Sequence, residues 1–200
     1  MIDAEKAATV LITALKEKGL TSEERLVEFE QHVESDWLPT NGARIVAKAW
    51  VNPEYKLRLL ADGKKAAAEL GFSIPRQHNQ LVALENTDSL HNVICCSLCS
   101  CTAFTIVGMA PGWYKSLEYR SRIVREGRRV LAEFGLHLPE SMKLKVWDTT
   151  ADHRYMVLPL RPPGTEGWDE ERLATLITQD SLIGVARLEP PFADPIVEGV

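Results

Sequence analysis

Apolar residues recur every three to four positions through the first seventy residues, which is the spacing of the buried face of a helix. Thr21-Ser22-Glu23-Glu24 has the form of a capping box, and Asn52-Pro53 places proline directly after an N-cap residue. These signals predict four helices: one at about residues 3–19, one from the capping box at 21–24 to about 36, one from 41 or 42 to about 50, and one at 53–70. We expect residues 1–75 to form an extended helical N-terminal arm, which either grips a partner chain or packs as a bundle on its own domain.

From residue 80 onward, short apolar segments alternate with turn residues. This pattern predicts strands at residues 81–84, 90–94, 142–147, 154–158 and 182–188, and helices at residues 116–134 and 170–178. The strands at 142–147 and 154–158 are expected to pair with each other across the turn at residues 148–152. The predicted fold class is α+β, in which residues 76–200 form a mixed α/β sheet domain that carries a cysteine-rich metal loop.

Composition narrows the class of protein. Apolar residues make up 45% of the 200 positions, and no run of them is long enough to cross a membrane. The net charge of −5 argues against a nucleic-acid-binding surface. The N-terminus has no signal-peptide pattern, and the clustered cysteines favour a reducing cytoplasm. The helix predicted at 116–134 carries arginines that are expected to form a solvated face or a protein interface: Arg120, Arg122, Arg125, Arg128 and Arg129.

All four cysteines lie within the seven residues 95–101. Disulfide bonds usually join distant segments, so this clustering argues against them, and thiolates this close repel one another unless a metal neutralises them. Cys96, Cys99 and Cys101 form C-x-x-C-x-C, which brings three sulfurs to one face of an ion, with the peptide nitrogens of Ser100 and Cys101 beside it. The spacing favours an open mononuclear metal site, with a zinc site, a redox pair and an iron–sulfur cluster as alternatives.

The segment around these cysteines, residues 92–102, resembles the metal-binding loop of the nitrile hydratase α subunit. The resemblance continues through residues 110–116, 146–150 and 154–159 and covers most of the chain. The metal-bearing subunit of thiocyanate hydrolase carries a similar loop and is the near alternative. A non-catalytic, metal-binding or nitric-oxide-responsive subunit is the interpretation from a different class.

The resemblance implies a lyase that hydrates a small-molecule nitrile to its amide at a low-spin, trivalent, non-haem metal. Cys96, Cys99 and Cys101 would supply thiolates, and the backbone nitrogens of Ser100 and Cys101 would complete the set of protein ligands. In that family the cysteines that match Cys99 and Cys101 are oxidised to sulfinic and sulfenic acid, and arginines of a β subunit bind their oxygens. The resemblance therefore implies a β subunit as partner, and a metallochaperone or activator protein for incorporation of the metal.

Single residues refine this hypothesis. Ser97 and Thr102 match the iron-type enzymes, so we expect one Fe(III) per chain, with Co(III) as the alternative. By resemblance, Cys101 is catalytic through its sulfenate oxygen, Gln77 hydrogen-bonds bound water, and Arg154 supports the metal loop. The alternatives are a surface loop position for Gln77 and a surface ion pair for Arg154.

Three positions depart from the family pattern. Phe104-Thr105 stands where Trp-Pro is usual, and Asp152 replaces a glutamate, which shortens the side chain by one methylene. Cys95 replaces an aliphatic residue and is expected to be a small buried apolar side chain.

Overall fold

The structure is a computed structural model that describes residues 3–75 and 79–189. Contacts within the chain divide it into two compact units, Met1–Trp37 and Leu38–Val200. The first unit contains the helices α1 (Ala4–Glu17) and α2 (Glu23–Asp36). α2 begins within the predicted capping segment, residues 21–24, and Ser22 is its N-cap, because the Ser22 hydroxyl oxygen accepts the Arg25 N–H. The two helices leave several large apolar side chains exposed, among them Val10, Leu11 and Phe29.

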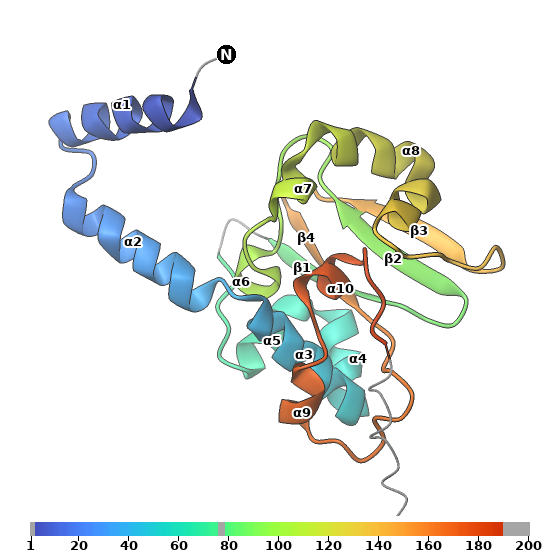
Figure 1. The fold of residues 1–200 in the computed structure, drawn as a ribbon. Helices are drawn as coiled ribbons and strands as arrows, with labels where there is room; N and C mark the ends of the chain where they lie inside the picture. Colours follow the sequence, from blue (N-terminus) through green and yellow to red (C-terminus); the bar gives the residue numbers. More distant parts are fainter. Residues whose placement is uncertain (1–2, 76–78, 190–200) are drawn as a thin grey trace, which may run out of the picture. The chain divides into compact units, whose positions relative to one another are not determined.

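The second unit consists of short helices around two small sheets (Figure 1). Its strands are β1 (Gln80–Glu85), β2 (Leu90–Cys95), β3 (Lys143–Asp148) and β4 (His153–Leu158). Its helices are α3 (Pro39–Val51), α4 (Pro53–Ala61), α5 (Gly63–Glu69), α6 (Phe104–Val107), α7 (Gly112–Lys115), α8 (Leu117–Glu133), α9 (Glu170–Ala174) and α10 (Gln179–Ile183). The α+β class predicted from the sequence is confirmed.

The helices α3, α4 and α5 belong to the same compact unit as the strands, whereas the sequence analysis grouped them with α1 and α2. They do so because α3 packs against α6 and α9, and because α4 and α5 pack against β1. The single helix predicted at 53–70 is two helices. Asp62 leaves the helical conformation, and its carboxylate accepts the Lys65 N–H at the start of α5.

The strand pairing differs from the predicted hairpin. β1 pairs in parallel with β4, and β2 pairs in parallel with β3, so the strands at 142–147 and 154–158 lie in different ladders. The turn at residues 148–152 connects β3 in one pair of strands to β4 in the other pair. The Thr149 N–H donates to the Cys95 carbonyl, and the Gln80 N–H donates to the Asp152 carbonyl. Apolar alternation identified the strands, but it does not specify which strands pair.

The strand predicted at 182–188 is also wrong, because Leu182 and Ile183 lie in α10. Both side chains are buried, and Gly184 ends the helix with φ +95°. A short buried apolar run has the same appearance in a strand and in a helix, so periodicity alone did not separate them. Among the described residues, no helix is both long and apolar enough to span a membrane.

Candidate metal centre

The cysteine loop follows directly from β2 and lies where two parallel strands end together. Register pairs Cys95, the last residue of β2, with Asp148, the last residue of β3. α8 packs over both strands (Figure 1). The loop therefore leaves the sheet beside the end of β3 and beneath α8, and it leads into α6.

Three sulfurs of this loop converge. The Sγ atoms of Cys96 and Cys99 are 3.3 Å apart, those of Cys99 and Cys101 are 2.7 Å apart, and all three lie within 4.8 Å of one another. Cys96 is buried, Cys101 is half-buried and Cys99 is exposed, so the cluster has one protected side and one open side. No other group of three His, Cys, Asp or Glu side chains converges in this way among the described residues.

The charges of the thiols depend on one another. A hydrogen bond from the Cys101 thiol holds the pKa of the Cys99 thiol below its ordinary value, and burial raises the pKa of Cys101 to about 12. Cys99 therefore ionises first, while Cys101 keeps its proton and donates it to the Cys99 sulfur. A coordinated ion would displace this proton, because metal ligands must be deprotonated.

Cys95 stands apart from this cluster. Its side chain is fully buried in the hydrophobic core, and burial raises the pKa of its thiol to about 12. It is a neutral, apolar side chain at ordinary pH, as the sequence analysis expected.

Two charged residues hold the backbone of the loop, and the sequence analysis missed both. The carboxylate of Asp148 accepts the Ser97 N–H at 2.9 Å and the Ser97 hydroxyl at 2.5 Å. Arg120 donates its Nε to the Cys96 carbonyl at 3.1 Å and its Nη2 to the Ser97 carbonyl at 2.9 Å. The sequence pattern predicts a turn at Asp148 and a solvated or interface face for Arg120. A correct pairing of β2 with β3 would have placed Asp148 beside the loop.

Buried tyrosines fix the two ends of the loop. The Tyr119 hydroxyl donates to the Ile94 carbonyl at 2.8 Å, just before the loop, and the Tyr114 hydroxyl donates to the Cys101 carbonyl at 3.1 Å. Burial raises the pKa of both phenols, so they remain hydrogen-bond donors at any ordinary pH. The loop is therefore anchored through main-chain atoms, which leaves its sulfurs free to bind a metal.

Arg154 lies on β4 and is 93% buried, with a relative exposure of 7%. It donates to the Thr150 and Ala151 carbonyls, and it forms no ion pair among the described residues. It is not a surface ion pair. Together with Cys101, it lines a cavity of about 130 Å³ whose walls include the apolar side chains of Phe104 and Met109.

Three further positions from the sequence analysis are Gln77, Asp152 and the backbone of Ser100 and Cys101. Gln77 falls outside the residues that the structure describes. Asp152 is exposed, and its carboxylate accepts a hydrogen bond from Asn79 at 2.7 Å. The nitrogen atoms of Ser100 and Cys101 belong to the same short loop as the three sulfurs, and their ligand roles remain proposals.

Comparison with known proteins identifies relatives that are nitrile hydratase α chains. The family profile described as "Nitrile hydratase, alpha chain" matches residues 2–186. The chain is similar to a double mutant of the Fe-type nitrile hydratase from Comamonas testosteroni Ni1, with a TM-score of 0.90 and 59% identity over 98% of this chain and 96% of that one. It is 44% identical over 188 residues to the cobalt-containing nitrile hydratase subunit α of Pseudonocardia thermophila, with 92% of each chain covered. It is 43% identical over 188 residues to thiocyanate hydrolase subunit γ of Thiobacillus thioparus, with 87% of this chain and 75% of that one covered.

The fold and the convergent sulfurs define a protein with a non-haem metal site built on a cysteine loop. The chain belongs to the nitrile hydratase α-chain family. Its relation to thiocyanate hydrolase is also clear, but sequence identity is higher for the Fe-type nitrile hydratase, at 59% against 43%.

Proposed function

We propose that this chain is the metal-bearing α subunit of a hydro-lyase that adds water to the C≡N bond of an organic nitrile and releases the amide. The observation that carries the proposal is the convergence of three cysteine sulfurs in a chain that belongs to the nitrile hydratase α-chain family. The activity is proposed for a complex with a β subunit, because Cys99 is exposed and Cys101 is only half-buried among the residues that the structure describes.

The donor set fits a transition-metal ion. Three soft sulfurs lie within 4.8 Å of one another, and the amide nitrogens of Ser100 and Cys101 lie in the same loop. The Asp148 and Arg120 hydrogen bonds hold the loop backbone without using any of these donors. When bound, a trivalent ion would act as a Lewis acid toward the nitrile or lower the pKa of water.

We assign the catalytic role to the Cys101 side chain, whose oxidised sulfur would act as a base or nucleophile toward water or nitrile. Cys101 and Arg154 line the same cavity, and the cationic guanidinium attracts negative charge on the Cys101 sulfur. Arg154 would thereby support an oxidised, anionic Cys101. The apolar side chains of Phe104 and Met109 would contact the carbon chain of the nitrile, and Gln77 would orient water.

Iron is our proposal for the metal. It rests on Ser97 and Thr102, which match the iron-type pattern, whereas the relatives include both iron and cobalt enzymes. The Ser97 hydroxyl donates to Asp148 and is therefore not a ligand, so any influence on metal choice acts through the shape of the loop.

The partners of this chain would be a β subunit and a metal-delivering activator protein. Exposed apolar side chains on α1 and α2, such as Leu11 and Phe29, are suited to contact another chain, and we propose that this helical arm binds the β subunit. The β subunit would also supply arginines for the oxygens of Cys99 and Cys101. A cytoplasmic location is consistent with four free cysteines.

The test is co-expression of the chain with its β subunit and activator, followed by assay on acetonitrile and on thiocyanate. Formation of acetamide that is lost in Cys96→Ala supports the proposal, because Cys96 is one of the three proposed sulfur ligands and the most buried of them. Turnover of thiocyanate in preference to acetonitrile would assign the chain to the alternative hydrolase. A metal-loaded complex that is inactive on both substrates would indicate a metal-binding subunit without catalytic function.

A further inference from the structure

Arg120 differs from the other arginines of α8 in what it contacts. Its guanidinium forks across two consecutive carbonyls of the cysteine loop, Cys96 at 3.1 Å and Ser97 at 2.9 Å. It forms no ion pair with a carboxylate among the described residues. Guanidinium groups on a helix surface usually face solvent or acidic neighbours, so a half-buried arginine that binds only loop carbonyls requires a different explanation.

The neighbouring arginines provide the contrast. Arg125 donates back to the Ser121 carbonyl one turn earlier, and Arg128 donates to carbonyls of residues 138, 139 and 142. Arg122 and Arg129 bind glutamates of α8 itself. Arg120 is therefore the arginine of α8 that reaches the metal loop.

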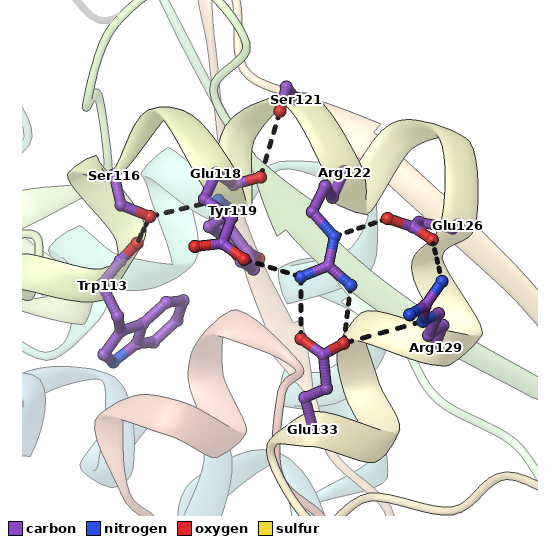
Figure 2. Close-up of polar contacts among 9 residues, drawn as sticks. All are labelled: Trp113, Ser116, Glu118, Tyr119, Ser121, Arg122, Glu126, Arg129 and Glu133. Atoms are coloured by element: carbon purple, nitrogen blue, oxygen red, sulfur yellow. Dashed lines mark hydrogen bonds and ion pairs between the residues drawn. The ribbon is translucent and has the colours of Figure 1, made fainter.

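The helix that carries Arg120 is bent, and ion pairs connect the two sides of the bend. α8 bends at Glu126, which has φ −134° and ψ 43°. Arg122 and Glu133 are eleven residues apart, which would separate them by about 16 Å along a straight helix. In the bent helix they form two hydrogen bonds, and Arg122 also binds Glu118 and Glu126 (Figure 2). Arg129 also pairs with Glu126 and Glu133, so an ionic network of five residues spans the bend.

The first turn of α8 is fixed independently of this network. The Ser116 hydroxyl oxygen accepts the Tyr119 N–H at 3.1 Å and caps the helix (Figure 2). The Tyr119 side chain is buried and reaches the Ile94 carbonyl in β2. Arg120 directly follows Tyr119, so the contacts of Tyr119 also fix the position of the Arg120 backbone, from which its side chain extends to the loop.

Two opposite charges therefore bind the loop at Ser97, and the positive one also binds Cys96. Arg120 binds the carbonyls of Cys96 and Ser97, and Asp148 binds the N–H and hydroxyl of Ser97. Rotation of the peptide between Cys96 and Ser97 would break the fork of Arg120. The same rotation would swing Cys99 relative to the Cys96 sulfur, which is 3.3 Å away. The fork thus fixes the geometry of two proposed metal donors.

We propose that Arg120 is a positioning residue of the metal centre, which fixes the Cys96–Ser97 backbone so that the three sulfurs stay convergent. This inference rests on the proposed function, because it concerns the same metal. Lysine at this position would keep the charge but could not bind both carbonyls in the fork geometry. Loss of a residue that orients a ligand typically weakens metal affinity by roughly 10- to 100-fold.

The experiment uses the complete complex with the β subunit and compares wild type, Arg120→Met, Arg120→Lys and Arg125→Met. Arg125→Met is the matched control, since it removes the same charge from the same helix without touching the loop. Each complex is assayed for metal content, for the half-time of metal release to a chelator, and for the metal–sulfur absorption band. We expect Arg120→Met to release metal roughly 10-fold or more faster and to shift the band, Arg120→Lys to be intermediate, and Arg125→Met to match wild type.

The proposal would be overturned if Arg120→Met released metal at the wild-type rate and kept the wild-type metal–sulfur absorption band. If Arg120→Lys behaved like wild type in both measurements, the fork geometry would not be required. If Arg120→Met does not fold, as judged by circular dichroism, Arg120→Lys carries the test. If the wild-type complex holds no metal, the proposed function fails instead. In that case hydrogen exchange at the amides of residues 97–101 tests the role of Arg120. If Arg120 holds the loop, these amides should exchange faster in Arg120→Met than in Arg125→Met.

Discussion

Asp148 offers the sharpest test of how the loop is held, because one carboxylate anchors one residue of the loop. Asp148→Ala removes both acceptors of Ser97, the one for its N–H at 2.9 Å and the one for its hydroxyl at 2.5 Å. A hydrogen bond to a charged group contributes about 1.5–3 kcal/mol. Asp148 is exposed, so water competes for these donors, and we take about 1–2 kcal/mol for the pair.

A loss of about 1–2 kcal/mol corresponds to about a 5- to 30-fold change in an equilibrium constant. Because the lost contacts hold the loop and not the core, we expect this change in metal affinity, with a small fall in the free energy of unfolding of the metal-free protein. The assay is competition between the loaded complex and a chelator of known affinity, together with urea unfolding of the metal-free chain.

The matched control is Asp88→Ala. Asp88 is an exposed aspartate in the turn between β1 and β2, and it forms no hydrogen bond or ion pair among the described residues. The Asp88→Ala substitution should leave metal affinity within about twofold of wild type, as expected for a surface substitution. Equal affinities for the Asp148 and Asp88 variants would refute the argument that Asp148 anchors the metal loop.

Two further predictions concern the fold that presents the loop. Gly184→Ala would place a methyl group 2.2 Å from the Asn92 carbonyl oxygen and would strain the backbone, whose φ is +95°. We therefore expect urea unfolding to show that this variant loses more than about 3 kcal/mol of the free energy of unfolding. Gly135→Ala, which has φ +85° and open space around the new methyl group, should lose only about 1–2 kcal/mol. Similar losses in the two variants would contradict the close approach. The His91 side chain is buried, its Nε2 donates to the Gly184 carbonyl, and burial lowers its pKa. As pH falls, His91 is therefore protonated at a higher pH in the unfolded chain than in the folded one, so the free energy of unfolding should fall below about pH 6.5. Urea titrations at pH 7.5 and 5.5 should show this fall in wild type and a smaller one in His91→Gln; an unchanged fall would assign it to other groups.

The parts of this structure that sequence analysis predicted are those set by neighbours in sequence. Asn52 caps α4 as expected, because an N-cap side chain bonds to a backbone N–H only two or three residues away, here that of Tyr55. The convergence of the sulfurs follows from the spacing of Cys96, Cys99 and Cys101 within one loop. These features need no knowledge of the rest of the fold.

The parts that sequence analysis missed depend on distant segments. The parallel pairing of β2 with β3 places Asp148 beside Ser97, although the two residues are 51 positions apart. Arg120 is one of five arginines on α8, and only the direction of its side chain distinguishes it from Arg125. No local pattern encodes that direction, because it depends on how α8 packs over the two strands.

The most direct test of the account is metal analysis of the purified complex, combined with the intact mass of the peptide that contains residues 95–101. We predict about one iron per chain and added oxygens on Cys99 and Cys101, the two thiols whose sulfurs lie 2.7 Å apart. Cobalt with the same oxygens would keep the function and correct the metal. Zinc, or four unmodified thiols in a complex that converts no acetonitrile to acetamide, would contradict the central claim.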